Sequence, residues 1–165
     1  MTVEVRNRLP GKLSRIRVNT RLLKMLATQA LELAGAANRY NLSIVLVTDK
    51  RIAALNARYH QVQGPTDVLS FDYGNSEGEL VISLDHVRSQ SRRFRTTPAR
   101  ELVLYVIHGI LHLHGHDDRT LRDRRRMRAA ERRLMSQSTR TRMPQELIIQ
   151  QVKKKRNARR PRLLA

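Results

Sequence analysis

Apolar residues recur along this chain with the two periods that distinguish strands from helices. Residues 2–7 (TVEVRN) alternate between polar and apolar positions, which predicts a strand. Residues 42–49 (LSIVLVTD) form a nearly continuous β-branched run, which is typical of a buried strand. Residues 67–73 and 79–85 predict two further strands, and the short turn GNSEG near their junction favours pairing of these two strands in one sheet.

Five segments have the spacing of helices, at residues 20–36, 50–60, 86–95, 98–115 and 119–135. Asn19 and Asp49 are placed to cap the first two, and Pro98 stands in the first turn of the fourth. Gly115 is expected to end that fourth helix. About four strands and five helices indicate one α+β domain, in which a mixed four-stranded sheet packs with the helices.

The composition changes near Ser136, and this change divides the chain into two parts. Residues 1–135 are expected to form the domain, and residues 136–165 a basic, largely disordered tail with one short helix around PQELIIQQV. The tail has nine basic residues and one acidic residue, so it carries +8 of the formal net charge of +19, and the domain carries the other +11. A domain this basic is expected to attract polyanions, and nucleic acid is the favoured partner.

The chain contains no cysteine, which excludes a disulfide framework and thiolate metal ligands. The N-terminal segment lacks the apolar run of a signal peptide, and no stretch approaches the roughly 18 apolar residues of a membrane span. We therefore expect a cytoplasmic protein without membrane contact. Any bound metal ion must use histidine and carboxylate ligands.

Four of the six histidines fall within HGILHLHGHDD, residues 108–118. His108 and His112 are four residues apart, which places them about 40° apart around a helix axis and one turn apart along it. Two imidazoles placed in this way can bind one metal ion, as in zinc sites of the H-x-x-x-H type. His114 lies about 200° from His112 and is expected to point away from that face.

A third ligand could come from just beyond the glycine stop, where the candidates are His116, Asp117 and Asp118. Three protein ligands leave a coordination position open for water, as in catalytic zinc sites. Histidines four apart also occur by chance on ordinary helices, and it is the glycine stop with the acidic pair that favours a metal site here.

The residue after His108 is Gly109. Zinc peptidases of the H-E-x-x-H type have their general base at that position. The sequence therefore disfavours peptidase activity.

The whole segment resembles a known signature. HGILHLHGHDD is similar to H-G-x-L-H-L-x-G-[Y/F]-D-H of the YbeY family, which comprises single-domain, metal-dependent endoribonucleases. LNARYHQVQGPTDVLSFDYG resembles that family's L-N-x-x-Y-R…P-T-D-V-L-S-F segment, and GELVISLDHVRSQ resembles its G-D-I-V-I-S strand and following helix. The three blocks occur in the family's order and cover roughly residues 43–135.

The resemblance implies a zincin-like fold and one Zn²⁺ ion held by His108, His112 and Asp118. It implies an RNA substrate, with single-strand-specific cleavage at the 3′ end of small-subunit rRNA during late ribosome maturation and quality control. It also implies a monomeric enzyme, with ribosomal or ribonuclease proteins as further partners.

The chain departs from the family pattern at two positions. The third ligand position is usually histidine, and here it is Asp118, whose negative charge would weaken the pull of the ion on bound water. His116 is the alternative third ligand. His60 stands where the family has an arginine linked to phosphate binding or catalysis, and a protonated histidine offers a phosphate fewer donors. Arg58 can compensate only if it lies on the same face of its helix.

Two functions remain open from the sequence. In the first, the protein is an endoribonuclease with His60 as the catalytic phosphate contact and no identified general base. In the second, it is a non-catalytic RNA-binding factor in ribosome assembly, with a structural or degenerate metal site. Thr66 and Ser70 lie in a matching segment, but structural roles are favoured for both, and Asp117 is expected to brace the site or cap the next helix.

The basic tail generates a test of its own. Deleting residues 151–165 should weaken RNA binding and flatten its dependence on salt, because each lysine or arginine that contacts a phosphate releases a counterion. Titration of a labelled RNA at several salt concentrations measures both effects, and an unchanged salt slope would count against a role for the tail.

Overall fold

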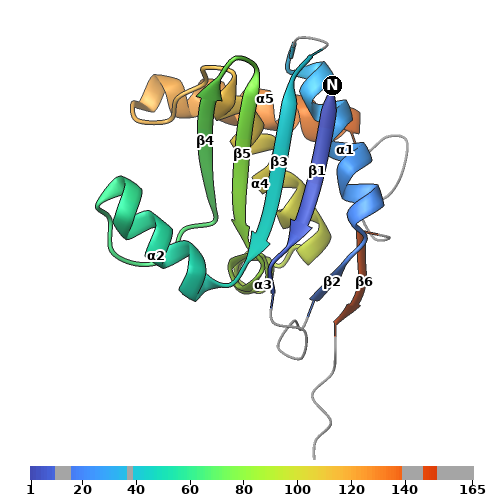
Figure 1. The fold of residues 1–165 in the computed structure, drawn as a ribbon, viewed down its shortest axis with the longest axis vertical. Helices are drawn as coiled ribbons and strands as arrows, with labels where there is room; N and C mark the ends of the chain where they lie inside the picture. Colours follow the sequence, from blue (N-terminus) through green and yellow to red (C-terminus); the bar gives the residue numbers. More distant parts are fainter. Residues whose placement is uncertain (10–15, 37–38, 139–146, 152–165) are drawn as a thin grey trace, which may run out of the picture.

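A mixed sheet of four strands forms the centre of the protein in a computed structural model, which describes residues 1–9, 16–36, 39–138 and 147–151 (Figure 1). The strand order is β1-β3-β5-β4. Strands β1 (Thr2–Asn7), β3 (Asn41–Val47) and β5 (Glu77–Ser83) are parallel, and the edge strand β4 (Val68–Gly74) runs antiparallel to β5. The predicted mixed four-stranded sheet is therefore confirmed, as is the pairing of its last two strands.

The helices confirm the predicted α+β class, and their ends differ from the predicted ones by a few residues. They are α1 (Thr20–Leu33), α2 (Asp49–His60), α3 (Leu84–Arg93), α4 (Pro98–Leu113) and α5 (Leu121–Ser138). Figure 1 shows α1, α4 and α5 behind the sheet, and α2 beside the edge strand β4. No helix in the described ranges is both long enough and apolar enough to cross a membrane.

The strands have two apolar faces because their side chains alternate. One face, with Ile44 and Leu80 at its centre, packs with α1, α4 and α5 in the main core. The other face forms a smaller cluster with α2, in which Ile52 contacts Val47, Leu69 and Val81. α2 and α4 therefore lie on opposite faces of the sheet.

Three expectations about local structure need correction. Thr48, and not Asp49, caps α2, because its side chain accepts a hydrogen bond from the Arg51 amide while Asp49 is already helical. Residues 148–151 form the strand β6, and not a helix, since they pair antiparallel with the unpredicted strand β2 (Ile16–Val18). α5 continues to Ser138, three residues beyond the expected end of this helix. The rest of the predicted tail, residues 139–146 and 152–165, lies outside the described residues.

α4 lies very close to the sheet at Gly109. A Cβ atom at this position would lie 2.6 Å from Cδ2 of Leu80 and 3.1 Å from Oγ of Ser70. Leu80 is completely buried in β5, so its side chain has little room to move. Packing therefore requires glycine at the position where an H-E-x-x-H peptidase has its glutamate, which is a physical reason for the absence of that base.

Substituting Gly109→Ala should destabilise the protein by about 1–3 kcal/mol through overpacking. At an open helix position the same change would stabilise by up to about 1 kcal/mol, so the sign of the change tests the close approach. Thermal or urea unfolding measures it. The shorter side chain in Leu80→Val should relieve part of the cost in the double variant, and strictly additive effects would contradict the predicted clash.

Candidate metal centre

Helix α4 positions the two central histidines. The Thr97 side chain caps its first turn by accepting from the Arg100 amide, and Pro98 follows in the first turn. The helix ends at Leu113, and Gly115 adopts a φ of +82°, a left-handed conformation that favours glycine. The chain then turns back toward α4, as the sequence predicts.

His108, His112 and Asp118 come together at this turn, and all three are half-buried. Their potential ligand atoms lie within 4.8 Å of one another. The Nε2 atoms of the two histidines are 3.0 Å apart, and their rings meet edge to face with centroids 4.5 Å apart. The three side chains therefore converge on one small volume.

Glu131 of α5 contacts His108 at Nδ1, while Nε2 of the same ring faces His112. Its Oε1 lies 2.7 Å from Nδ1 of His108, and the two side chains are 17% and 21% exposed. This contact fixes the ring orientation and directs Nε2 toward His112, as carboxylates do for histidines that bind metal ions. Sequence analysis missed Glu131, because it lies 23 residues from its partner in an arginine-rich helix that offers no local signal.

The surrounding charges act differently on the two histidines. Burial lowers the pKa of His108, but the hydrogen bond and charge of Glu131 outweigh it with help from Asp67 and Asp118, so the pKa is raised. Burial and then the neighbouring His108 lower the pKa of His112. At neutral pH, His112 therefore offers an unprotonated nitrogen more readily than His108 does.

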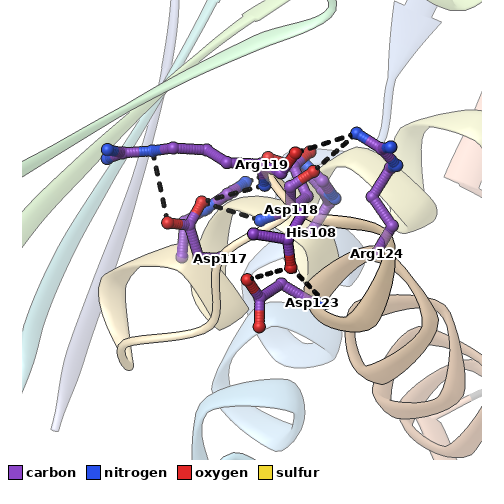
Figure 2. Close-up of polar contacts among 8 residues, drawn as sticks. His108, Asp117, Asp118, Arg119, Asp123 and Arg124 are labelled. Carbon is purple, nitrogen blue, oxygen red and sulfur yellow. Dashed lines mark hydrogen bonds and ion pairs between the residues drawn. The ribbon is translucent and has the colours of Figure 1, made fainter.

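Local contacts shape the turn that carries Asp118 (Figure 2). Oδ1 of Asp117 accepts hydrogen bonds from the Asp118 and Arg119 amides at 2.7 and 3.3 Å, and these bonds help to lower the pKa of Asp117. Nη1 of Arg124, from the first turns of α5, donates to the carbonyl oxygens of Asp118 and Arg119. Asp117 thus braces the turn. Thr120 is the residue that caps α5, since its Oγ1 accepts from the Asp123 amide.

The other two histidines of the segment have structural contacts. Nδ1 of His114 lies 2.8 Å from the carbonyl oxygen of Ile110, and its ring packs on Tyr40 with centroids 5.3 Å apart. This agrees with the expectation that His114 points away. His116 is not part of the convergent group found among the described residues, and its backbone forms a hydrogen bond with His112.

The geometry fits a single metal ion of the zinc type. A tetrahedral ion with bonds of about 2.1 Å separates its ligand atoms by roughly 3.4 Å, so small side-chain rotations would complete the site. Imidazole nitrogens with one carboxylate oxygen suit Zn²⁺, and the second ring nitrogen of His108 already has a partner in Glu131. Three protein ligands leave a fourth position open.

Ser70 and Thr66 form local contacts in the structure. Oγ of Ser70 donates to the carbonyl oxygen of Gly109 at 3.4 Å, where β4 meets α4. Oγ1 of Thr66 donates to Asp67, whose carboxylate also accepts from the Val68 amide. Both contacts agree with the favoured structural roles, and Asp67 contributes negative charge near His108.

His60 is not part of the convergent group among the described residues. It is the exposed last residue of α2, on the other face of the sheet from α4. Arg58 lies two helix positions earlier, about 200° around the axis, so the condition for compensation is not met. The Arg58 guanidinium lies over the Tyr59 ring instead, 5.4 Å from its centroid.

The fold and this group define an α+β protein with a candidate His–His–Asp metal centre. The family of endoribonuclease YbeY matches residues 11–139, which is most of the chain. The protein belongs to this family, and the relatives it matches are named endoribonucleases.

Individual relatives agree with this assignment. An endoribonuclease YbeY of Pelotomaculum thermopropionicum is 33% identical over 86% of this chain and 100% of its own length. That of Desulfitobacterium hafniense is 36% identical over 72% of this chain and 84% of its own length, whereas a 38% identical relative in Myxococcus xanthus is matched over only 38% of its length. A Thermotoga maritima protein known from its solution structure is similar with a TM-score of 0.57, at 27% identity over 82% of this chain and 89% of its own.

Substituting Glu131→Gln should weaken Zn²⁺ binding about 10- to 100-fold, because the neutral amide orients His108 less firmly and does not raise its basicity. Competition with a chromophoric chelator measures the dissociation constant. Glu32→Gln, an exposed change on α1, is the matched control and should leave binding unchanged. Equal affinities in the wild type and Glu131→Gln would show that Glu131 does not support the site.

Proposed function

We propose that this protein is a Zn²⁺-dependent endoribonuclease that cleaves single-stranded RNA at the 3′ end of small-subunit rRNA. The observation that carries the proposal is the convergence of His108, His112 and Asp118, with Glu131 behind them. Family membership supports RNA as the substrate class, and the net charge of +19 favours a polyanion. The resemblance of three sequence blocks supports the assignment to rRNA.

The site residues divide the work of the reaction. His108, His112 and Asp118 would hold the ion, and Glu131 keeps His108 in the ligating orientation. When bound, a zinc ion lowers the pKa of water and polarises a phosphoryl oxygen. The braces from Asp117 and Arg124 fix the backbone around Asp118, so the carboxylate needs little reorganisation to bind.

His60 is proposed as a phosphate contact away from the metal ligands. α2 and the turn between α4 and α5 lie beside the same edge strand, β4, so an RNA strand crossing that edge could reach both (Figure 1). A protonated imidazole donates to a phosphate oxygen, but it does so less well as the pH rises. Arginine at this position would keep its charge and offer two parallel hydrogen bonds.

The departure at Asp118 favours one alternative, a non-catalytic RNA-binding factor with a structural metal site. An anionic third ligand reduces the positive charge of the centre and with it the acidity of bound water. Ribosome assembly could use such a protein through its RNA affinity alone. The two functions differ in whether the metal is needed for RNA cleavage or only for stability.

Purified full-length protein should cleave a single-stranded rRNA 3′ fragment, and chelation of the metal or His108→Ala should lower the rate at least about 100-fold. His86→Gln, which alters a histidine on α3, should retain activity.

The third ligand is tested by substitution in the same protein. Asp118→Asn should lose the metal ion, whereas Asp118→His and His116→Gln should both retain it. Gel analysis gives the rates, and mass spectrometry gives the metal content.

Cleavage that survives both chelation and His108→Ala would exclude the proposed metal-dependent reaction. Tight RNA binding with one bound metal ion but no cleavage would favour the assembly factor. Metal loss in His116→Gln together with retention in Asp118→Asn would replace Asp118 by His116 as the third ligand.

A further inference from the structure

Helix α5 presents a large surface of unneutralised positive charge. Leu121–Ser138 contains seven arginines and only two acidic residues, Asp123 and Glu131. All seven arginines are exposed: Arg122, Arg124, Arg125, Arg126, Arg128, Arg132 and Arg133. The buried positions of the helix are few and apolar apart from Ser138, so the arginines do not serve the core.

Both acidic residues of α5 are engaged elsewhere. Glu131 contacts His108, and Asp123 accepts from Oγ1 of Thr120 at 2.6 Å in the first turn. Within the described part of the chain, no arginine of α5 forms an ion pair. Arginines three or four positions apart repel one another, and this repulsion opposes the helix until an anion neutralises it.

One row of these arginines shares α5 with Glu131, the residue that contacts His108 of the metal centre. Arg125, Arg128 and Arg132 are spaced by three and four residues, so they share a helix face and span about 10 Å along the axis. Arg128 is also three positions before Glu131, which places it next to the residue that contacts His108. The row thus begins two residues after Asp123 and continues past the position of Glu131 on the same helix.

We propose that this row, Arg125, Arg128 and Arg132, binds successive phosphates of the RNA strand that enters the metal centre. The guanidinium group suits the task, because it remains charged and donates two parallel hydrogen bonds to a phosphate. The contacts carry no base information, so the row sets the position and direction of the strand without selecting its sequence. This inference deepens the proposed function, since it names the surface on which that same site holds its RNA.

A binding experiment separates the row from the general charge of the protein. The test variant is Arg125→Gln/Arg128→Gln/Arg132→Gln, and the control is Arg92→Gln/Arg93→Gln/Arg100→Gln. The control removes the same charge from exposed arginines on α3 and the start of α4. Figure 1 shows α3 at the other end of the sheet from α5. Glutamine keeps a high helix propensity, and thermal melting verifies that both variants fold.

The readout is the dissociation constant of a fluorescent single-stranded rRNA 3′ fragment, measured by anisotropy over a range of salt concentrations with the metal bound. The test variant should bind at least about 10-fold more weakly at low salt, and its salt slope should fall by roughly two for three lost phosphate contacts. In cleavage assays KM should rise while kcat changes little, because the row binds ground state and transition state alike. The control should change each quantity much less.

Equal losses in the test and control variants would overturn the proposal, because total charge would then account for binding. Unchanged binding in the test variant would overturn it as well. RNA binding can be measured without cleavage. A wild-type protein that binds RNA through the row but does not cleave it would contradict the proposed enzymatic function and still support the proposed role of the row.

Discussion

The position of α4 depends on a single missing side chain, the Cβ of residue 109. Because Gly109 lets the helix backbone approach Leu80 and Ser70, α4 can lie in the main core with its apolar residues buried on several sides. His108 directly precedes the glycine and His112 follows it three residues later, and both side chains are half-buried. The close contact of Gly109 with Leu80 therefore determines how deeply the two histidines are buried. It also excludes a carboxylate base at position 109.

α5 packs on α4 and α1 through a single apolar side. Met127, Ala130, Leu134 and Met135 supply the apolar side, and half of the other positions are arginine. The contact of Glu131 with His108 is thus both a tertiary anchor and a support for the candidate metal ligand. A helix with this charge has a weak intrinsic preference to stay folded alone, so its position and the geometry of the centre depend on each other.

Periodicity predicted the parts of the fold whose signals are local. The strand predicted at residues 2–7 has the same bounds as β1, and the four-residue spacing of His108 and His112 correctly placed both on one helix. Strands β2 and β6 escaped prediction because three- and four-residue strands form only by pairing across most of the chain. Glu131 escaped for a similar reason, since its meaning lies in a partner that only the packing of α5 on α4 brings near.

The charges of the centre explain why phosphate binding must come from outside it. The carboxylates of Asp118, in the centre, and Glu131, against His108, would offset the two positive charges of a bound Zn²⁺. Asp67 adds a further negative charge near His108. A histidine at position 118 would leave the centre more positive and better able to attract RNA by itself. In this chain, cations around the site must supply the attraction for RNA. The arginines of α5 are such a group, because they lie on the same helix as Glu131.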